Sequence, residues 1–292
     1  MNGRVVVGAL ALLVGWTLSA AETHADGVIK AVLENVAKLK AADPAAVPMA
    51  FWDFDGTIIK GDVSEGLDEN GQRKFRGLIE RTIEEGLSPV YSAKDGWAKY
   101  RDADYPRLKE LGLWLAWPFN AQIYEGVETA KLDAFCREEY AKTYRKWYFA
   151  SSVKIFKALA AAGVENYVIS GSPEVFVRNA AESLGIPRER IRGIRVAEVG
   201  GRMTTRLVYP LPFAADKVEN LREFVGARPH GVAIAAFGNS YYNDAPFMRY
   251  VVTQANLPGG AKGTALMING MKKRPGYEGL FITADEDDVV GE

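Results

Sequence analysis

The sequence 51-FWDFDGT-57 places two aspartates directly after a short apolar run. Side chains alternate along a strand, so Asp53 and Asp55 can face one ligand once the chain turns at Gly56. Two carboxylates repel each other by about 4 kcal/mol at roughly 4 Å and an effective dielectric constant of about 20, so a shared proton or a cation must offset the repulsion. One carboxylate can attack phosphorus, and the other can hold the proton that a leaving alcohol needs.

Helices and strands alternate on both sides of this stretch. A helical pattern over 25–44 precedes the strand at 48–55, and a regular alternation begins near residue 150. The expected elements there are helices at 152–163, 173–185 and 215–226, strands at 166–170, 232–237 and 249–255, and a strand or hairpin at 191–208. This alternation predicts an α/β fold in which helices cover both faces of a Rossmann-like parallel sheet.

Three of the predicted strands end in polar residues. These residues are Asp53, Asp55 and Thr57, then Ser170, Gly171 and Ser172, and finally Asn239 and Asp244. Ligands of parallel α/β sheets bind at the C-terminal ends of the strands. We therefore expect one site built from all three strand ends.

Two further features favour an anionic ligand. Ser170 and the free N–H groups of the helix that starts at Pro173 can form an anion site, although an ordinary capped helix has the same sequence. Lys217 lies near the start of an amphipathic helix, where a cation is not favoured. That lysine either binds a dianion or is simply solvated.

These stretches, in this order, resemble the haloacid dehalogenase superfamily of phosphotransferases, and residues 170–221 resemble its phosphoserine-phosphatase-like branch. The resemblance implies that Asp53 is the nucleophile that becomes an aspartyl-phosphate. It implies that Asp55 is the general acid and base, a residue that the dehalogenase branch lacks. The phosphate-binding residues that it implies are Thr57, Ser170, Gly171 and Lys217.

The resemblance also implies a Mg²⁺ ion held by Asp53, by the backbone carbonyl of Asp55 and by the loop 238-GNSYYND-244. In the superfamily this loop has Gly-Asp and a second Asp four or five residues later. Here Asn239 stands at the first acid. Asp244 fits the longer spacing, and Asn243 would fit the shorter one. Because an amide brings no charge, we expect the loop to bind the metal ion more weakly. Whether this change only adjusts the metal affinity or abolishes turnover stays open.

The branch carries a helical, C1-type cap after the first strand, and the aromatic-rich segment 66–149 occupies that place. Asp62 lies near the position where phosphoserine phosphatases put an acid for the ammonium group of the substrate, and Glu65 is a second candidate. Either residue can instead be a solvated loop acid. Two interpretations stay open for the aromatic residues of the cap: they hold a cationic head group by cation–π contact, or they form only the core of the cap. The residues in question are Trp97, Tyr100, Trp114 and Trp117.

Composition excludes several other classes of protein. A formal net charge of −1 gives no basic field, so nucleic acid is not an expected partner. One cysteine, Cys136, and two histidines, His24 and His230, exclude a disulfide framework and a His-ligated zinc site. Residues 1–21 have the form of a cleaved signal peptide. Their apolar stretch, 5-VVVGALALLVGWTL-18, is shorter than the roughly 20 apolar residues that a membrane span needs. The expected product is periplasmic or secreted, without a stable membrane anchor.

The predicted organisation is therefore a signal peptide at 1–21, a hydrolase core at 26–65 and 150–292, and a cap at 66–149. The predicted function is a Mg²⁺-dependent phosphomonoesterase for a small phosphate ester such as phosphoserine, phosphocholine or phosphoethanolamine. Two alternatives stay open. One is a catalytically impaired protein that binds a phospho-ligand, and the other is a phosphotransferase that uses an acceptor alcohol.

Overall fold

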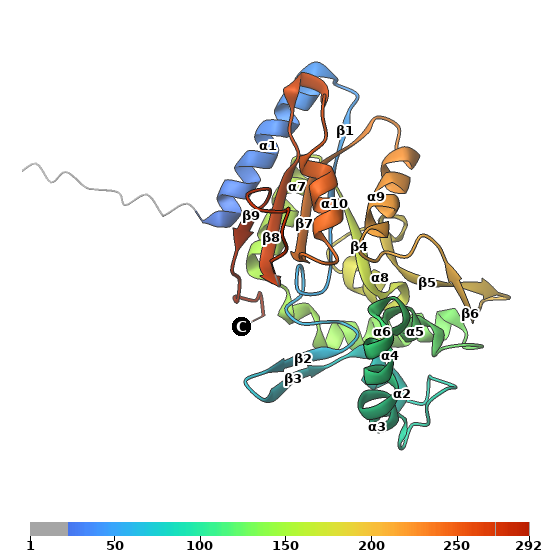
Figure 1. The fold of residues 1–292 in the computed structure, drawn as a ribbon. Helices are drawn as coiled ribbons and strands as arrows, with labels where there is room; N and C mark the ends of the chain where they lie inside the picture. Colours follow the sequence, from blue (N-terminus) through green and yellow to red (C-terminus); the bar gives the residue numbers. More distant parts are fainter. Residues whose placement is uncertain (1–22, 272, 292) are drawn as a thin grey trace, which may run out of the picture.

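A seven-stranded sheet runs through the middle of the computed structural model, which describes residues 23–271 and 273–291 (Figure 1). The strand order is β6-β5-β4-β1-β7-β8-β9, and all neighbouring strands are parallel except β5 and β6. The strands are β1 (Val47–Trp52), β4 (Glu165–Pro173), β5 (Ile191–Val199), β6 (Arg202–Val208), β7 (Gly231–Ser240), β8 (Thr264–Met271) and β9 (Ile282–Ala284). The predicted fold class is confirmed.

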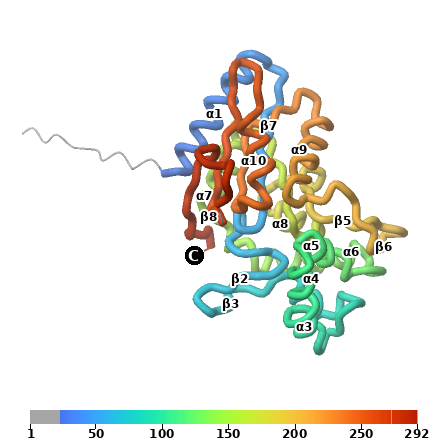
Figure 2. Tube along the Cα trace, viewed as in Figure 1, coloured from blue at the N-terminus to red at the C-terminus, as the bar shows by residue number. Residues whose placement is uncertain are grey.

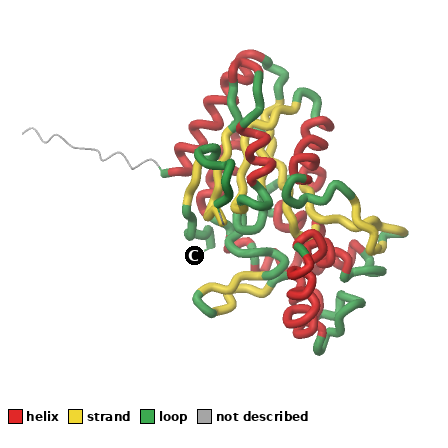
Figure 3. The backbone as a smooth tube through the Cα atoms, in the orientation of Figure 1, coloured by secondary structure: helices red, strands yellow, loops and turns green. Residues whose placement is uncertain are grey.

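Helices cover both faces of this sheet (Figure 3). One hydrophobic cluster contains residues of α1 (His24–Ala42), α7 (Ala150–Ala161) and α8 (Glu174–Glu182), and the other contains residues of α9 (Asp216–Ala227) and α10 (Ala245–Val252). Two short 3₁₀ turns lie at Arg188–Arg190 and Pro258–Gly260. Strand β1 contributes side chains to both clusters, because successive side chains of a strand point to opposite faces of the sheet. Trp52 belongs to the first cluster and Phe51 to the second.

The segment 66–149 lies between β1 and α7 and packs at one end of the sheet (Figure 2). We call it the inserted segment. It contains β2 (Gly66–Glu69), β3 (Gln72–Arg76), α2 (Leu78–Glu84), α3 (Gly96–Lys99), a π-helical turn (Tyr100–Asp104), α4 (Tyr105–Leu111), α5 (Leu113–Gln122), α6 (Thr129–Thr143) and a 3₁₀ turn (Arg145–Trp147).

The chain enters and leaves the inserted segment at one place. Lys60 N donates to Trp147 O at 2.8 Å, and Phe149 N donates to Ile58 O at 2.9 Å, so the two crossings lie side by side. Residues 288–291 add a third stretch, because Val290 N donates to Tyr148 O at 2.9 Å. The three stretches together form a junction joined by main-chain hydrogen bonds.

A buried carboxylate fixes α6 of the inserted segment to the core. Asp133, which is 7% exposed, accepts hydrogen bonds from Arg178 Nε at 2.7 Å and from Arg188 Nη2 at 3.1 Å. Burial by itself would raise the pKa of Asp133, but the guanidinium groups outweigh burial and hold that pKa below its ordinary value. The ionised carboxylate therefore stabilises the docking of α6 on α8.

Two expectations about secondary structure are wrong. The predicted strand at 249–255 lies mostly in helix α10, whose buried residues Phe247, Met248 and Val251 follow helical spacing after the N-cap Asp244. The expected helical start of the inserted segment is the hairpin β2–β3. Its turn, Asn70-Gly71, has positive φ at both residues, which this dipeptide adopts readily.

The signal-peptide prediction falls on residues 1–21, which lie outside the described part of the chain. Among residues 23–271 and 273–291, no helix has both the length and the hydrophobicity needed to cross a membrane.

Candidate active site

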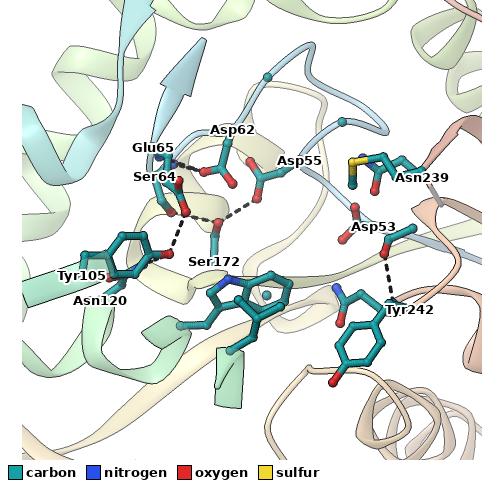
Figure 4. A pocket seen from close by; sticks show the side chains of 18 of the residues that line it. Asp53, Asp55, Asp62, Ser64, Glu65, Tyr105, Asn120, Ser172, Asn239 and Tyr242 are labelled. Carbon is teal, nitrogen blue, oxygen red and sulfur yellow. Dashed lines mark hydrogen bonds between the residues drawn. The ribbon is translucent and has the colours of Figure 1, made fainter. Parts of the chain in front are cut away.

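The C-terminal ends of three neighbouring strands, β4, β1 and β7, meet at one cavity of about 740 Å³. Asp53 and Asp55 come from the end of β1, Gly171 and Ser172 from β4, and Asn239 from β7. Figure 4 shows Asp53 and Asn239 on one side of this cavity and Asp62 and Glu65 on the other. The structure thus brings the three polar strand ends together, at the point where strand order favours a ligand site.

Asp53 belongs to a buried charged triplet with Lys217 and Asp244. Lys217 Nζ lies 2.7 Å from Asp53 Oδ1 and 2.6 Å from Asp244 Oδ1, and Lys217 and Asp244 are both fully buried. Burial opposes the charge on Lys217, but the two carboxylates outweigh it and raise the pKa of the lysine. Lys217 is therefore no solvated lysine, and it contacts Asp53 without lining the cavity.

Burial raises the pKa of Asp53 to about 7, and the charge of Asp244 adds to the rise while Lys217 opposes it. Thr57 Oγ1 donates to Asp53 Oδ2 at 3.1 Å. Thr57 is completely buried and, like Lys217, does not line the cavity. Both residues thus hold the nucleophile candidate from behind.

Asp55 lies beside Asp53 in a hydrogen-bonded setting of its own. Its Oδ1 accepts the Val63 N–H at 2.7 Å, and its Oδ2 accepts the Ser172 hydroxyl at 2.7 Å and the Ser170 hydroxyl at 3.2 Å. Burial raises the pKa of Asp55 despite these donors. A carboxyl group with a raised pKa beside a second carboxylate is suited to acid and base work.

Ser170 orients Asp55 and does not line the cavity, whereas Gly171 and Ser172 do. The ring of Trp117, from α5, packs on Gly171 so closely that a Cβ there would lie 2.8 Å from two ring carbons. Glycine at this position lets the inserted segment contact the β4 loop directly. The role of Ser172 was not predicted, although Ser172 belongs to the same polar strand end as Ser170.

The loop after β7 contributes Asp244, and not Asn243, to the charged triplet. Asp244 Oδ2 accepts the N–H groups of Asn239 and Ser240 at 3.0 and 2.9 Å, so both of its oxygens have partners. The Asn243 side chain instead accepts the Ala214 N–H at 2.7 Å. The longer of the two spacings considered for this loop, which selects Asp244, therefore places a carboxylate beside Lys217.

The donors fit a hard divalent cation in type but carry little charge. Among residues 23–271 and 273–291, no group of three His, Cys, Asp or Glu side chains is arranged to hold a metal ion. Asp53 and Asn239 both line the cavity, and the Asn239 amide lies so close to Gly56 that a Cβ at residue 56 would overlap it. With the carbonyl of Asp55, these oxygens make a set with one carboxylate, which suits Mg²⁺ that keeps several waters.

The two acids proposed to bind an ammonium group have different settings. Asp62 Oδ1 accepts the N–H groups of Ser64 and Glu65 at 2.7 and 2.9 Å, and burial, with the charges of Asp55 and Glu65, raises the Asp62 pKa well above its ordinary value. Glu65 accepts the Tyr105 hydroxyl at 2.7 Å and pairs with Lys109 at 3.0 Å. Both acids line the cavity, but Glu65 already has a cation.

Of the four aromatics considered for a cationic head group, only Trp117 lines the cavity. Tyr100 is buried and stacks on Trp97, with 5.5 Å between ring centroids, while Trp114 is 61% exposed. Tyr100 and Trp97 are therefore core of the inserted segment. The cavity is also lined by residues that were not predicted as site residues, among them Tyr105, Asn120, Tyr242, Lys273 and Arg274.

A family model described as haloacid dehalogenase-like hydrolase matches residues 50–249. Among solved structures, the chain is similar to a protein of unknown function from Bordetella pertussis Tohama I, with 15% identity and a TM-score of 0.57 over 82% of this chain and 99% of that one. It is also similar to a functionally unknown protein from Anaerococcus prevotii DSM 20548, with 13% identity and a TM-score of 0.51 over 83% and 86% of the two chains. At these identities the two similarities show the fold alone. No curated protein matches the chain at a significant level.

Proposed function

The chain belongs to the haloacid dehalogenase-like hydrolase family, and we propose that it is a Mg²⁺-dependent phosphomonoesterase whose nucleophile is Asp53. The family match confirms the predicted hydrolase type. One observation carries the rest of the proposal: Asp53 and Asp55 open into the same cavity, while Lys217 pairs with Asp53 from the buried side. A carboxylate held in this way is oriented and kept available for attack.

In the proposed reaction, an oxygen of Asp53 forms a bond to phosphorus as the ester P–O bond breaks. The leaving alkoxide takes a proton from Asp55, whose raised pKa favours the protonated form before the transfer. Asp55 then takes a proton from a water molecule that attacks phosphorus. The bond between phosphorus and the Asp53 oxygen breaks, inorganic phosphate leaves, and both carboxyl groups are restored. Ser170 and Ser172 keep Asp55 in place through their hydrogen bonds to its Oδ2.

Asp53, Asn239 and the carbonyl of Asp55 would hold the metal ion. Asp244, which the resemblance implies as a further ligand, does not line the cavity and has partners at both oxygens, so we leave it out of the proposed set. When bound, Mg²⁺ supplies positive charge against the phosphoryl oxygens. Lys217 acts through Asp53 and Asp244: it lowers the cost of keeping two buried carboxylates close together.

Hydrolysis of p-nitrophenyl phosphate with and without Mg²⁺ tests this function. Wild-type protein should turn it over only with the metal, and Asp53→Asn should remove turnover. Asp102→Asn, at an exposed aspartate outside the cavity, is the matched control and should leave the rate unchanged. Turnover that survives Asp53→Asn would contradict the assignment of the nucleophile.

A second candidate, a phospho-ligand binding protein without turnover, is favoured by Asn239. This amide stands where the resemblance expects a carboxylate, so the metal would meet one charge fewer. Binding of benzylphosphonate without turnover of any ester in a broad panel would support this candidate. Transfer of the phosphoryl group to an added alcohol, seen by product analysis, would indicate a phosphotransferase.

For substrates with an ammonium group, we propose Asp62 as the acidic contact, because Lys109 already pairs with Glu65. Burial and the charges of Asp55 and Glu65 raise the pKa of Asp62, and a bound ammonium group would favour its ionised form. A comparison of phosphoserine, phosphoethanolamine and phosphocholine with glycerol phosphate tests this part of the proposal. Asp62→Asn should remove any preference for the amines. Equal turnover of cationic and neutral esters by the wild type would count against an ammonium contact.

Export is proposed on residues 1–21 alone. Fractionation of producing bacterial cells, with mass measurement of the mature chain, would show whether the protein is cleaved near Ala21 and leaves the cytoplasm.

A further inference from the structure

Two cations line the same cavity as the catalytic aspartates. Lys273 and Arg274 follow strand β8, whose last residue, Met271, also lines the cavity. Both side chains are exposed, and the carboxylates that line the cavity and form ion pairs do so with other cations, Asp53 with Lys217 and Glu65 with Lys109. The acids on the other side have their own partners, since Asp62 accepts two N–H groups and Glu65 pairs with Lys109.

Arg274 contacts one end of an aromatic series. Its guanidinium carbon lies 4.8 Å from the ring centroid of Tyr242. Tyr242 packs against Phe213 with 5.7 Å between centroids, and Phe213 packs edge-on against Trp117 at 5.1 Å. Trp117 and Tyr242 both line the cavity, so a wall of aromatic rings leads from the Gly171 loop to Arg274.

The cavity is also larger than a phosphoamino acid requires. Its volume of about 740 Å³ lies in the range of sites that enclose drug-sized ligands. A phosphoryl group at Asp53 would leave most of this space for the leaving group. The part of that space beside Tyr242 and Arg274 offers apolar surface and positive charge.

From this arrangement we propose that Lys273 and Arg274 bind a second anionic group, a carboxylate or a phosphate, on the leaving alcohol of the substrate. The leaving group lies along Trp117 and Tyr242, and its negative charge meets the two cations at the mouth of the cavity. The inference rests on the proposed phosphomonoesterase function and specifies the class of ester that the same site selects.

Matched substrates test the second anion. The pair is 4-carboxybenzyl phosphate and 4-carbamoylbenzyl phosphate, which differ in charge at one position far from the ester bond. Wild-type protein should prefer the carboxylate by about tenfold in kcat/KM, equivalent to about 1.4 kcal/mol. The double variant Lys273→Ala/Arg274→Ala should lose this preference, because its kcat/KM for the carboxylate ester falls to the level of the carbamoyl ester. Lys30→Ala/Lys38→Ala, which removes two exposed charges from α1, should keep it.

The corresponding benzylphosphonates, which cannot be hydrolysed, separate the two proposals when their binding is measured by calorimetry. Tighter binding of the carboxylate form that disappears in Lys273→Ala/Arg274→Ala supports the second anion site, even if no ester is turned over and the proposed function fails. Turnover of both esters without a preference for the carboxylate overturns the anion site and leaves the phosphomonoesterase standing. An equal loss of both esters in the double variant also overturns it.

Discussion

Replacing Lys217 with methionine removes the cation that Asp53 and Asp244 share while keeping most of the length of the side chain. In the wild type the ammonium group lies 2.7 and 2.6 Å from the two carboxylates. Removal of one partner from a buried ion pair costs about 3–5 kcal/mol. We expect Lys217→Met to lower the free energy of unfolding of the metal-free protein by about that amount near pH 6.

The pH dependence makes this prediction specific to the triplet. With Lys217 present, burial and Asp244 raise the pKa of Asp53 to about 7; without it, that pKa must rise further. A carboxyl group whose folded pKa is raised contributes stability below the unfolded pKa, and the contribution is lost as pH rises through the folded pKa. In the wild type this loss is complete a little above pH 7, whereas in the variant it continues, at about 1.4 kcal/mol per pH unit.

Urea unfolding followed by circular dichroism, in EDTA and at several pH values from about 6 to 9, measures the difference. The stability gap between wild type and Lys217→Met should widen above pH 7. Arg222→Met, at an exposed position of the same helix, should show a small gap that does not depend on pH. A constant gap for Lys217→Met over this range would refute the electrostatic reasoning about Asp53.

Three further changes follow from contacts described above. Asp133→Asn should destabilise the protein by about 2–3 kcal/mol at neutral pH, because it removes the negative charge that Arg178 and Arg188 share. The difference in unfolding free energy, measured with urea, should shrink as pH falls through the lowered pKa of Asp133. Gly171→Ala should displace the Trp117 ring, at a cost of about 1–3 kcal/mol, and should change tryptophan fluorescence and raise KM. Asn239→Asp should lower the Mg²⁺ concentration needed for half-maximal turnover and tighten metal binding in calorimetry, and an unchanged metal titration would remove Asn239 from the ligand set.

The sheet could be predicted because its signals are local. Strand β1 and the strands after residue 150 alternate with amphipathic helices, and the polar ends of β1, β4 and β7 point to one edge by the geometry of parallel sheets. The error at α10 arose because "RYVVTQA" is rich in β-branched residues, while the capping Asp244 and the buried residues Phe247 and Met248, which favour a helix, lie before it. The hairpin β2–β3 had a local signal, Asn70-Gly71, which the surrounding charge obscured.

Site residues at strand ends could be assigned from sequence, but those supplied by distant segments could not. Lys217 was identified through family resemblance, whereas its full burial between Asp53 and Asp244 depends on the packing of α9 on the sheet. Tyr242, Lys273 and Arg274 reach the cavity only because loops far apart in the chain converge there. Neither periodicity nor composition contains that information.

The junction of the inserted segment has a practical consequence for anyone who alters the end of the chain. Residues 288–291 run along the two crossings, where Ala150 N donates to Asp288 O at 3.0 Å and Gly291 N donates to Lys146 O at 3.1 Å. These residues therefore tie together the two crossings by which the inserted segment is attached to the core. A truncation before Asp288 would remove these hydrogen bonds and expose main-chain groups of residues 146–150 to water. We expect the mobility of the inserted segment to increase, although no residue that lines the cavity has been changed.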